Sequence, residues 1–242
     1  MKGPDTMQQD HIHSAFDADL SSLRSQVMTM GGLVENSIRQ VSKALNRRDS
    51  ERADRVVAGD VEIDKLEELI SRKAIELIAL RQPNARDLRT AIAVMKIAVS
   101  LERVADYSKN IAKRSTVLTH SPPLDIGIGS IKRLSKAVRI QIKHVLDAFI
   151  KGDVERADFV IYRDEEIDQM YNALFREFLT HMMEDPRSIS SCMHFLFIAK
   201  NLERMGDHAT AIAEQVIYMI TGTLPTDDRD KNVMTDFDEY LT

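Results

Sequence analysis

Hydrophobic residues recur every three or four positions along most of the chain, which is the spacing of one face of an α-helix. In the first stripe these residues are Leu20, Leu23, Val27, Met30, Val34, Ile38, Val41 and Leu45. We expect this helix to start near Ser14, with Asp17 in a possible capping box, and to end at the polar run 46–49. A second helix is expected over about 50–81, where Ile63, Leu66, Ile70, Ala74 and Leu77 form one stripe. A turn at 82–84 leads into a third helix that runs to about 118.

The second half of the chain repeats this plan. SERADRVVAGDVEIDKLEEL, which starts at Ser50, matches VERADFVIYRDEEIDQMYNA 104 residues later, and LERVADYSKNIAK, which starts at Leu101, matches LERMGDHATAIAE 101 residues later. Three more helices are therefore expected at about 129–151, 153–184 and 186–221. Short turns between long helices favour antiparallel neighbours. The prediction is an all-α fold of two tandem, sequence-related three-helix bundles, over residues 12–120 and 128–221, followed by an acidic, mobile tail at 222–242.

Composition agrees with this plan and excludes several classes of protein. Nine Gly, six Pro and no Trp in 242 residues favour long helices over many short strands. A net charge of −5 argues against a nucleic-acid partner, and no apolar run is long enough for membrane insertion. The first residues lack the apolar core of a secretory signal. Cys192 is the single cysteine and lies in an apolar run, so we expect a core residue in a protein of the reducing cytoplasm.

Four pairs of carboxylates stand out against this background, each spaced one helical turn apart. They are Asp60/Asp64, Glu102/Asp106, Asp164/Asp168 and Glu203/Asp207. Residues four apart share a helix face, and like charges so placed destabilise a helix by roughly 0.2–0.5 kcal/mol per pair. Their recurrence at equivalent positions of the two repeats therefore calls for a counter-charge.

The hairpin geometry brings the pairs together. Asp60 and Asp106 lie equally far from the turn at Pro83, as do Asp64 and Glu102, and the second repeat has the same symmetry about its own turn. Each bundle should thus gather four carboxylates at one level. Oxygen-only ligands suit Mg²⁺, Mn²⁺, Ca²⁺ or iron better than a structural zinc, so the pattern predicts one metal site per bundle. The alternative is that Arg103, Arg204 and Lys65 neutralise the carboxylates by salt bridges.

These segments resemble the PhoU family. RQPNARDLR followed by LERVADYSKNIA, and later NLERMGDHATAIAE, are similar to that family's recurring segments, and the resemblance covers about residues 12–221. It implies a cytoplasmic, non-enzymatic, dimeric protein that restrains phosphate uptake and the phosphate-starvation response. The implied partners are a sensor histidine kinase and the ATPase of the phosphate ABC transporter.

The resemblance also implies metal ions, with iron, Mn, Mg or Zn as candidates. Carried over residue by residue, the ligands would be Asp60, Asp64, Glu102, Asp106, Asp164, Asp168, Glu203 and Asp207. His208 follows Asp207 and could ligate or orient, but its counterpart in the first repeat is Tyr107.

Two other functions remain as alternatives. A carboxylate-bridged metal oxidase of the ferritin-like kind would use Glu-x-x-His motifs, and none of the seven histidines has a Glu three residues before it. A metal-free helical scaffold or adaptor would act through its faces alone. The sequence contains neither a phosphate-cradling Gly-rich loop nor a nucleophile elbow, so we expect no enzyme.

Overall fold

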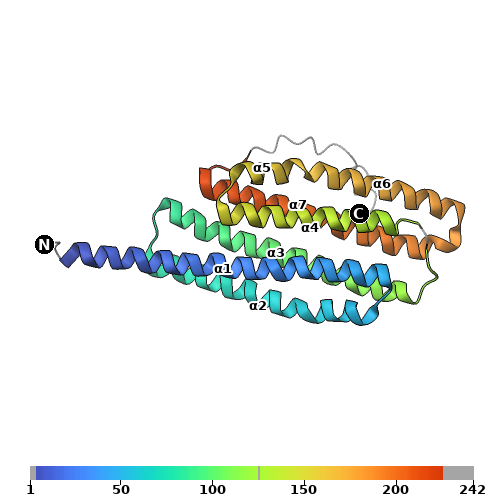
Figure 1. The fold of residues 1–242 in the computed structure, drawn as a ribbon, viewed down its shortest axis with the longest axis horizontal. Coiled ribbons are helices and arrows are strands. Elements are labelled where there is room, and N and C mark those ends of the chain that lie inside the picture. Colours follow the sequence, from blue (N-terminus) through green and yellow to red (C-terminus); the bar gives the residue numbers. More distant parts are fainter. Residues whose placement is uncertain (1–3, 125, 226–242) are drawn as a thin grey trace, which may run out of the picture.

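The computed structural model describes residues 4–124 and 126–225, which form helices joined by short loops (Figure 1). The first bundle consists of α1 (Pro4–Arg47), α2 (Ser50–Arg81) and α3 (Ala85–Thr119). The second consists of α4 (Ile128–Lys151), α5 (Val154–Tyr162), α6 (Asp164–Glu184), the single 3-10 turn η1 (Pro186–Ser188) and α7 (Ile189–Thr221). The expected all-α fold with two related bundles is confirmed.

Polar caps set the helix starts at equivalent places in the two bundles. The Asp49 carboxylate accepts a hydrogen bond from the Arg52 backbone N at 2.9 Å at the start of α2, and Asp153 accepts one from the Arg156 backbone N at 3.0 Å at the start of α5. Such caps satisfy backbone N–H groups that have no partner within the helix. The repeated Asp therefore begins the second helix of each bundle.

The predicted apolar stripes form the core. All eight residues of the α1 stripe are buried, and in the α2 stripe only Leu66 keeps partial exposure. Cys192 is fully buried among apolar side chains, as expected.

The two bundles pack side by side through α1 against α4 and α3 against α7 (Figure 1). At Gly31 on α1, a Cβ atom would lie 2.6 Å from a terminal methyl group of Leu146 on α4, so a larger residue at this position would force the leucine side chain to move. Tyr107 on α3 packs against His208 on α7 with ring centroids 5.7 Å apart, and Arg114 lies 4.0 Å over the Phe197 ring. Since a later α3 residue meets an earlier α7 residue, the two motif-bearing helices run antiparallel at the centre of the molecule.

Two predicted boundaries were wrong. The helix expected over 153–184 is divided at Arg163, because three consecutive acidic residues from Asp164 favour a new helix N-terminus over the interior of a helix. The first helix begins at Pro4, ahead of the expected Ser14, and proline is well suited to the first position of a helix.

Residues 226–242 of the predicted acidic tail lie outside the described residues, so its mobility stays a prediction. Within the described ranges, no helix combines the length and the apolar character needed to cross a membrane.

Candidate metal centre

The eight predicted carboxylates fall into two groups, one in each bundle. In the first bundle Asp60 and Asp64 lie on α2 and face Glu102 and Asp106 on α3. In the second bundle Asp164 and Asp168 lie in the first two turns of α6, and Glu203 and Asp207 lie on α7. The mirror symmetry about each turn therefore placed the pairs on the correct facing helices. That all eight bind metal stays a prediction.

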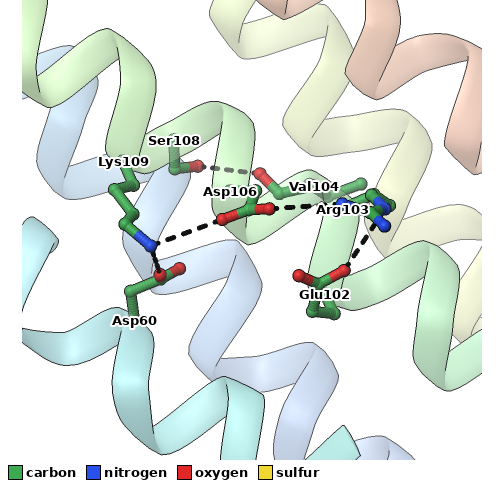
Figure 2. A network of polar contacts seen from close by, with 7 residues as sticks. All are labelled: Asp60, Glu102, Arg103, Val104, Asp106, Ser108 and Lys109. Carbon is green, nitrogen blue, oxygen red and sulfur yellow. Dashed lines mark hydrogen bonds and ion pairs between the residues drawn. The ribbon is translucent and has the colours of Figure 1, made fainter.

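An ammonium from the chain itself lies between two carboxylates of the first group (Figure 2). Asp60 is only 3% exposed, and its Oδ2 accepts a hydrogen bond from Nζ of Lys109 at 2.5 Å. The same Nζ lies 3.5 Å from Oδ1 of Asp106. Lys109 therefore bridges α2 and α3 between two of the predicted ligands.

A guanidinium neutralises the outer side of this group. Arg103 lies 3.5 Å from Oε2 of Glu102 through Nε and 3.5 Å from Oδ2 of Asp106 through Nη1. Burial, followed by the nearby Asp106 carboxylate, raises the pKa of Glu102 to about 7 against the opposing charge of Arg103. Burial also raises the pKa of Asp64, and the charge of Asp60 adds to the effect. The carboxylates remain crowded even with two cations among them.

The second group brings carboxylate oxygens closer together. One oxygen from each of Asp168, Glu203 and Asp207 can be chosen so that all three lie within 4.8 Å of one another. Asp164 lies behind them, 5% exposed, where Nε2 of Gln141 donates to its Oδ1 at 3.2 Å. At Gly206 on α7 an added Cβ would be 3.1 Å from that same Oδ1, whereas the first repeat has Ala105 at this position. The glycine thus permits α6 and α7 to approach closely beside the carboxylates.

The electrostatics of the second group favour a cation. The residue Asp207 is exposed as a whole, but atoms packed around its carboxyl desolvate it, and the charges of Glu203, Asp164 and Asp168 then raise its pKa to about 7. Lys200 donates to Oε1 of Glu203 at 2.8 Å. In the described part of the chain, the other oxygen of Glu203, Oε2, is buried without a hydrogen-bond partner. A buried carboxylate oxygen without a partner destabilises the folded protein unless a cation or a hydrogen-bond donor contacts it. The second group therefore fits a hard metal ion.

Residues that neighbour the two groups in sequence pack together at the α3–α7 contact. Tyr107 and His208, which follow the motif residues Asp106 and Asp207, pack against each other. A hydrogen bond with Tyr107 raises the pKa of Arg204, so this arginine is directed to the other bundle. Burial lowers the pKa of His208, and the charges of Arg103 and Arg204 lower it further, which keeps the ring neutral.

The surfaces beside the two groups also differ. In the first repeat a groove of about 350 Å³ runs between α1 and α2 and is lined by Gly59 and Asp60, among others. The equivalent space in the second repeat measures about 20 Å³, because Phe159 and Arg163 stand where the first repeat has Arg55 and Gly59. The two repeats share a helical arrangement but differ in the volume of this groove and in the charged side chains that line it.

The sequence pattern did not identify the two lysines that contact these groups. Of the three cations considered as alternative partners, Arg103 does pair with the first group. Lys109 and Lys200 each lie three residues from a motif carboxylate on the same helix, which is a spacing at which opposite charges pair, so this signal was present in the sequence.

Comparison with known proteins places this geometry in a family. The family model described as "PhoU domain" matches residues 27–115 and again residues 131–216. A "Phosphate-specific transport system accessory protein PhoU homolog" of Caulobacter vibrioides is 49% identical over 222 residues, which cover 92% of this chain and 96% of that protein. A homologue of the same name from Rhizobium meliloti is 45% identical over 95% of this chain and 97% of its own length.

Solved structures agree with the sequence relatives. The crystal structure of PhoU from Pseudomonas aeruginosa superposes with a TM-score of 0.84 at 36% identity, covering 86% of this chain and 100% of that one. The phosphate transport system regulatory protein PhoU from Streptococcus pneumoniae gives 0.81 at 29% identity, covering 87% of this chain and 99% of that one.

Proposed function

The chain belongs to the PhoU family, and we propose that it restrains phosphate uptake and the phosphate-starvation response through contacts with other proteins. The observation that carries this proposal is the match of both repeats to the family model, together with relatives named as accessory proteins of the phosphate-specific transport system. The role is regulatory and not catalytic. The protein would act in the cytoplasm as a homodimer, between the ATPase of the phosphate ABC transporter and a sensor histidine kinase.

The second proposal concerns the metal. Asp164, Asp168, Glu203 and Asp207 would hold a divalent or ferric ion, with iron, Mn, Mg or Zn as candidates. Support comes from the three clustered carboxylate oxygens and from the buried Oε2 of Glu203. When bound, the ion supplies positive charge to carboxylates that otherwise raise one another's pKa.

The position of these residues suggests what such a site would do for a regulator. Asp164 and Asp168 begin α6 directly after the break at Arg163, whereas Glu203 and Asp207 lie in the middle of α7. Ligands from both helices would join the start of α6 to α7. Because His208 on α7 packs against Tyr107 on α3, the joined helices also contact the first bundle. The site would therefore fix the relative positions of helices whose surfaces a partner protein binds.

A metal-free adaptor remains the second candidate, and one observation favours it. Lys109 and Arg103 show that this chain can neutralise a carboxylate group with its own cations. Such an adaptor would regulate in the same way but would not respond to chelators.

Deletion of the gene tests the regulatory proposal. In phosphate-rich medium we expect the deletion strain to take up phosphate at an increased rate through its high-affinity system, and the wild-type gene to restore repression. An Asp168→Asn, Asp207→Asn variant should restore repression poorly if the metal site matters, whereas Glu51→Gln, at an exposed position outside both groups, should act as wild type. Uptake that is unchanged by the deletion would refute the regulatory role. Full repression by the double variant would favour the metal-free adaptor.

A further inference from the structure

Position 109 of the first repeat corresponds to position 210 of the second, and the two residues differ in charge. Lys109 lies three residues after the motif Asp106, and Thr210 lies three residues after the motif Asp207. The Lys109 ammonium is 2.5 Å from Oδ2 of Asp60 and 3.5 Å from Oδ1 of Asp106 (Figure 2). The ammonium is thus held by one carboxylate from α2 and one from α3, which is the position that the symmetry of the repeats predicts for a metal ion.

Thr210 offers no such charge. It is 3% exposed, and in the described residues its Oγ1 is buried without a hydrogen-bond partner. It lies one helical turn after Gly206, whose position faces Asp164 and Ile167 of α6. On the face of α7 that packs against α6, the second repeat thus has a short, neutral side chain. At the equivalent position of α3 the first repeat has Lys109.

The arginines of the two motifs also differ in their partners. Arg103 lies 3.5 Å from both Glu102 and Asp106, whereas its counterpart Arg204 interacts most strongly with Tyr107 across the interface between the bundles and more weakly with the charges of Glu203 and Asp207. Lys200 does reach the second group, where its ammonium lies 2.8 Å from Oε1 of Glu203, but in the described residues Oε2 of Glu203 stays buried without a hydrogen-bond partner. The first group is therefore neutralised from two sides, and the second retains an unsatisfied oxygen.

We propose that Lys109 occupies the cation position of the first carboxylate group, so that only the second repeat takes up a metal ion. This inference rests on the metal site of the proposed function. A metal ion and the ammonium cannot share the space between Asp60 and Asp106, because both require the same oxygens and repel each other. The lysine has the advantage of being tethered to α3, so its local concentration does not fall when free metal is scarce.

Exchanging the two residues tests the inference directly. Lys109→Thr and Thr210→Lys are each compared with the wild type by equilibrium dialysis against Mn²⁺, with bound metal measured by elemental analysis and folding followed by circular dichroism. We expect Lys109→Thr to bind more Mn²⁺ per chain, approaching twice the wild-type amount. Thr210→Lys should lose most of the bound metal.

A second pair of variants leaves Lys109 in place and does not depend on the folding of the exchanged proteins. Asp207→Asn should remove bound Mn²⁺, and the matched Asp106→Asn should leave it at the wild-type level. Equal losses from both variants would overturn the inference and leave the proposed metal function standing. If the wild type binds no Mn²⁺ but Lys109→Thr does, Lys109 blocks the first group as inferred, but the metal site in the second repeat, and with it that half of the inference, is wrong. If no variant binds Mn²⁺, both are overturned.

Discussion

Replacing Lys109 with methionine is expected to destabilise the metal-free protein by about 3 kcal/mol. Methionine keeps the length and apolar stem of lysine but removes the ammonium. Asp60 is 3% exposed and would retain a buried carboxylate without its 2.5 Å partner. Breaking a buried ion pair from one side costs more than the pair contributes, because the remaining charge is left in a poorly solvated place. Urea unfolding monitored by circular dichroism, in the presence of a chelator, measures the effect.

Two controls separate this explanation from a general loss of packing. In an Asp60→Asn background, Lys109→Met should lose most of its effect, because no buried charge is left unpaired. Arg103→Met removes ion pairs of a side chain that is 55% exposed, so it should cost less than about 1 kcal/mol. If Lys109→Met costs no more than Arg103→Met, Lys109 is not the counter-charge of Asp60.

The metal-free protein is also expected to lose stability as the pH rises from about 4 to about 7, in part through Asp207. Its pKa is raised from the ordinary aspartate value of 3.8 to about 7 in the folded protein, mainly by burial of the carboxyl. Over this range the folded chain holds a proton that the unfolded chain has released, so each rise in pH favours unfolding. Because the residue is exposed, solvent screening reduces the effect of so large a shift, and we expect about 1–2 kcal/mol.

Asp207→Asn isolates this contribution, since asparagine does not titrate. Its unfolding free energy should fall less steeply with pH than that of the wild type, so that at pH 8 the metal-free variant is the more stable protein. Stability curves that run parallel for the two proteins would show that Asp207 titrates normally. Added Mn²⁺ should stabilise the wild type more at pH 8 than at pH 5, because protons compete with the metal for the same oxygens.

The fold could be predicted from the sequence because its determinants repeat. The apolar stripe of α1 and the aspartate caps at Asp49 and Asp153 are local signals that the packing reinforces. The division at Arg163 was missed because the apolar pattern continues through it, with Val160 and Ile167 both buried on either side. A periodic pattern reports which face is buried but not whether the backbone stays continuous.

For the candidate site, the sequence predicted only which carboxylates face each other, because that follows from the symmetry of each helical hairpin about its turn. Equal distances from the turns placed Asp60 opposite Asp106 and Asp164 opposite Asp207. Which cation reaches each group depends on side-chain directions that the spacing does not specify. Lys109 turns toward Asp60 on the neighbouring helix, whereas Arg204 hydrogen-bonds Tyr107 on the other bundle. The partner of each cation depends on packing between helices, so it cannot be predicted from the spacing of residues along one helix.

Metal binding by the second carboxylate group is tested most directly by calorimetric titration of Mn²⁺ into chelator-treated protein at pH 8. The wild type should bind Mn²⁺, and a Glu203→Gln, Asp207→Asn variant should bind it at least about tenfold more weakly. Glu51→Gln, at an exposed position away from both groups, serves as the matched control and should bind as the wild type does. Equal affinity in the wild type and the double variant, or no binding by the wild type, would contradict the metal site proposed here.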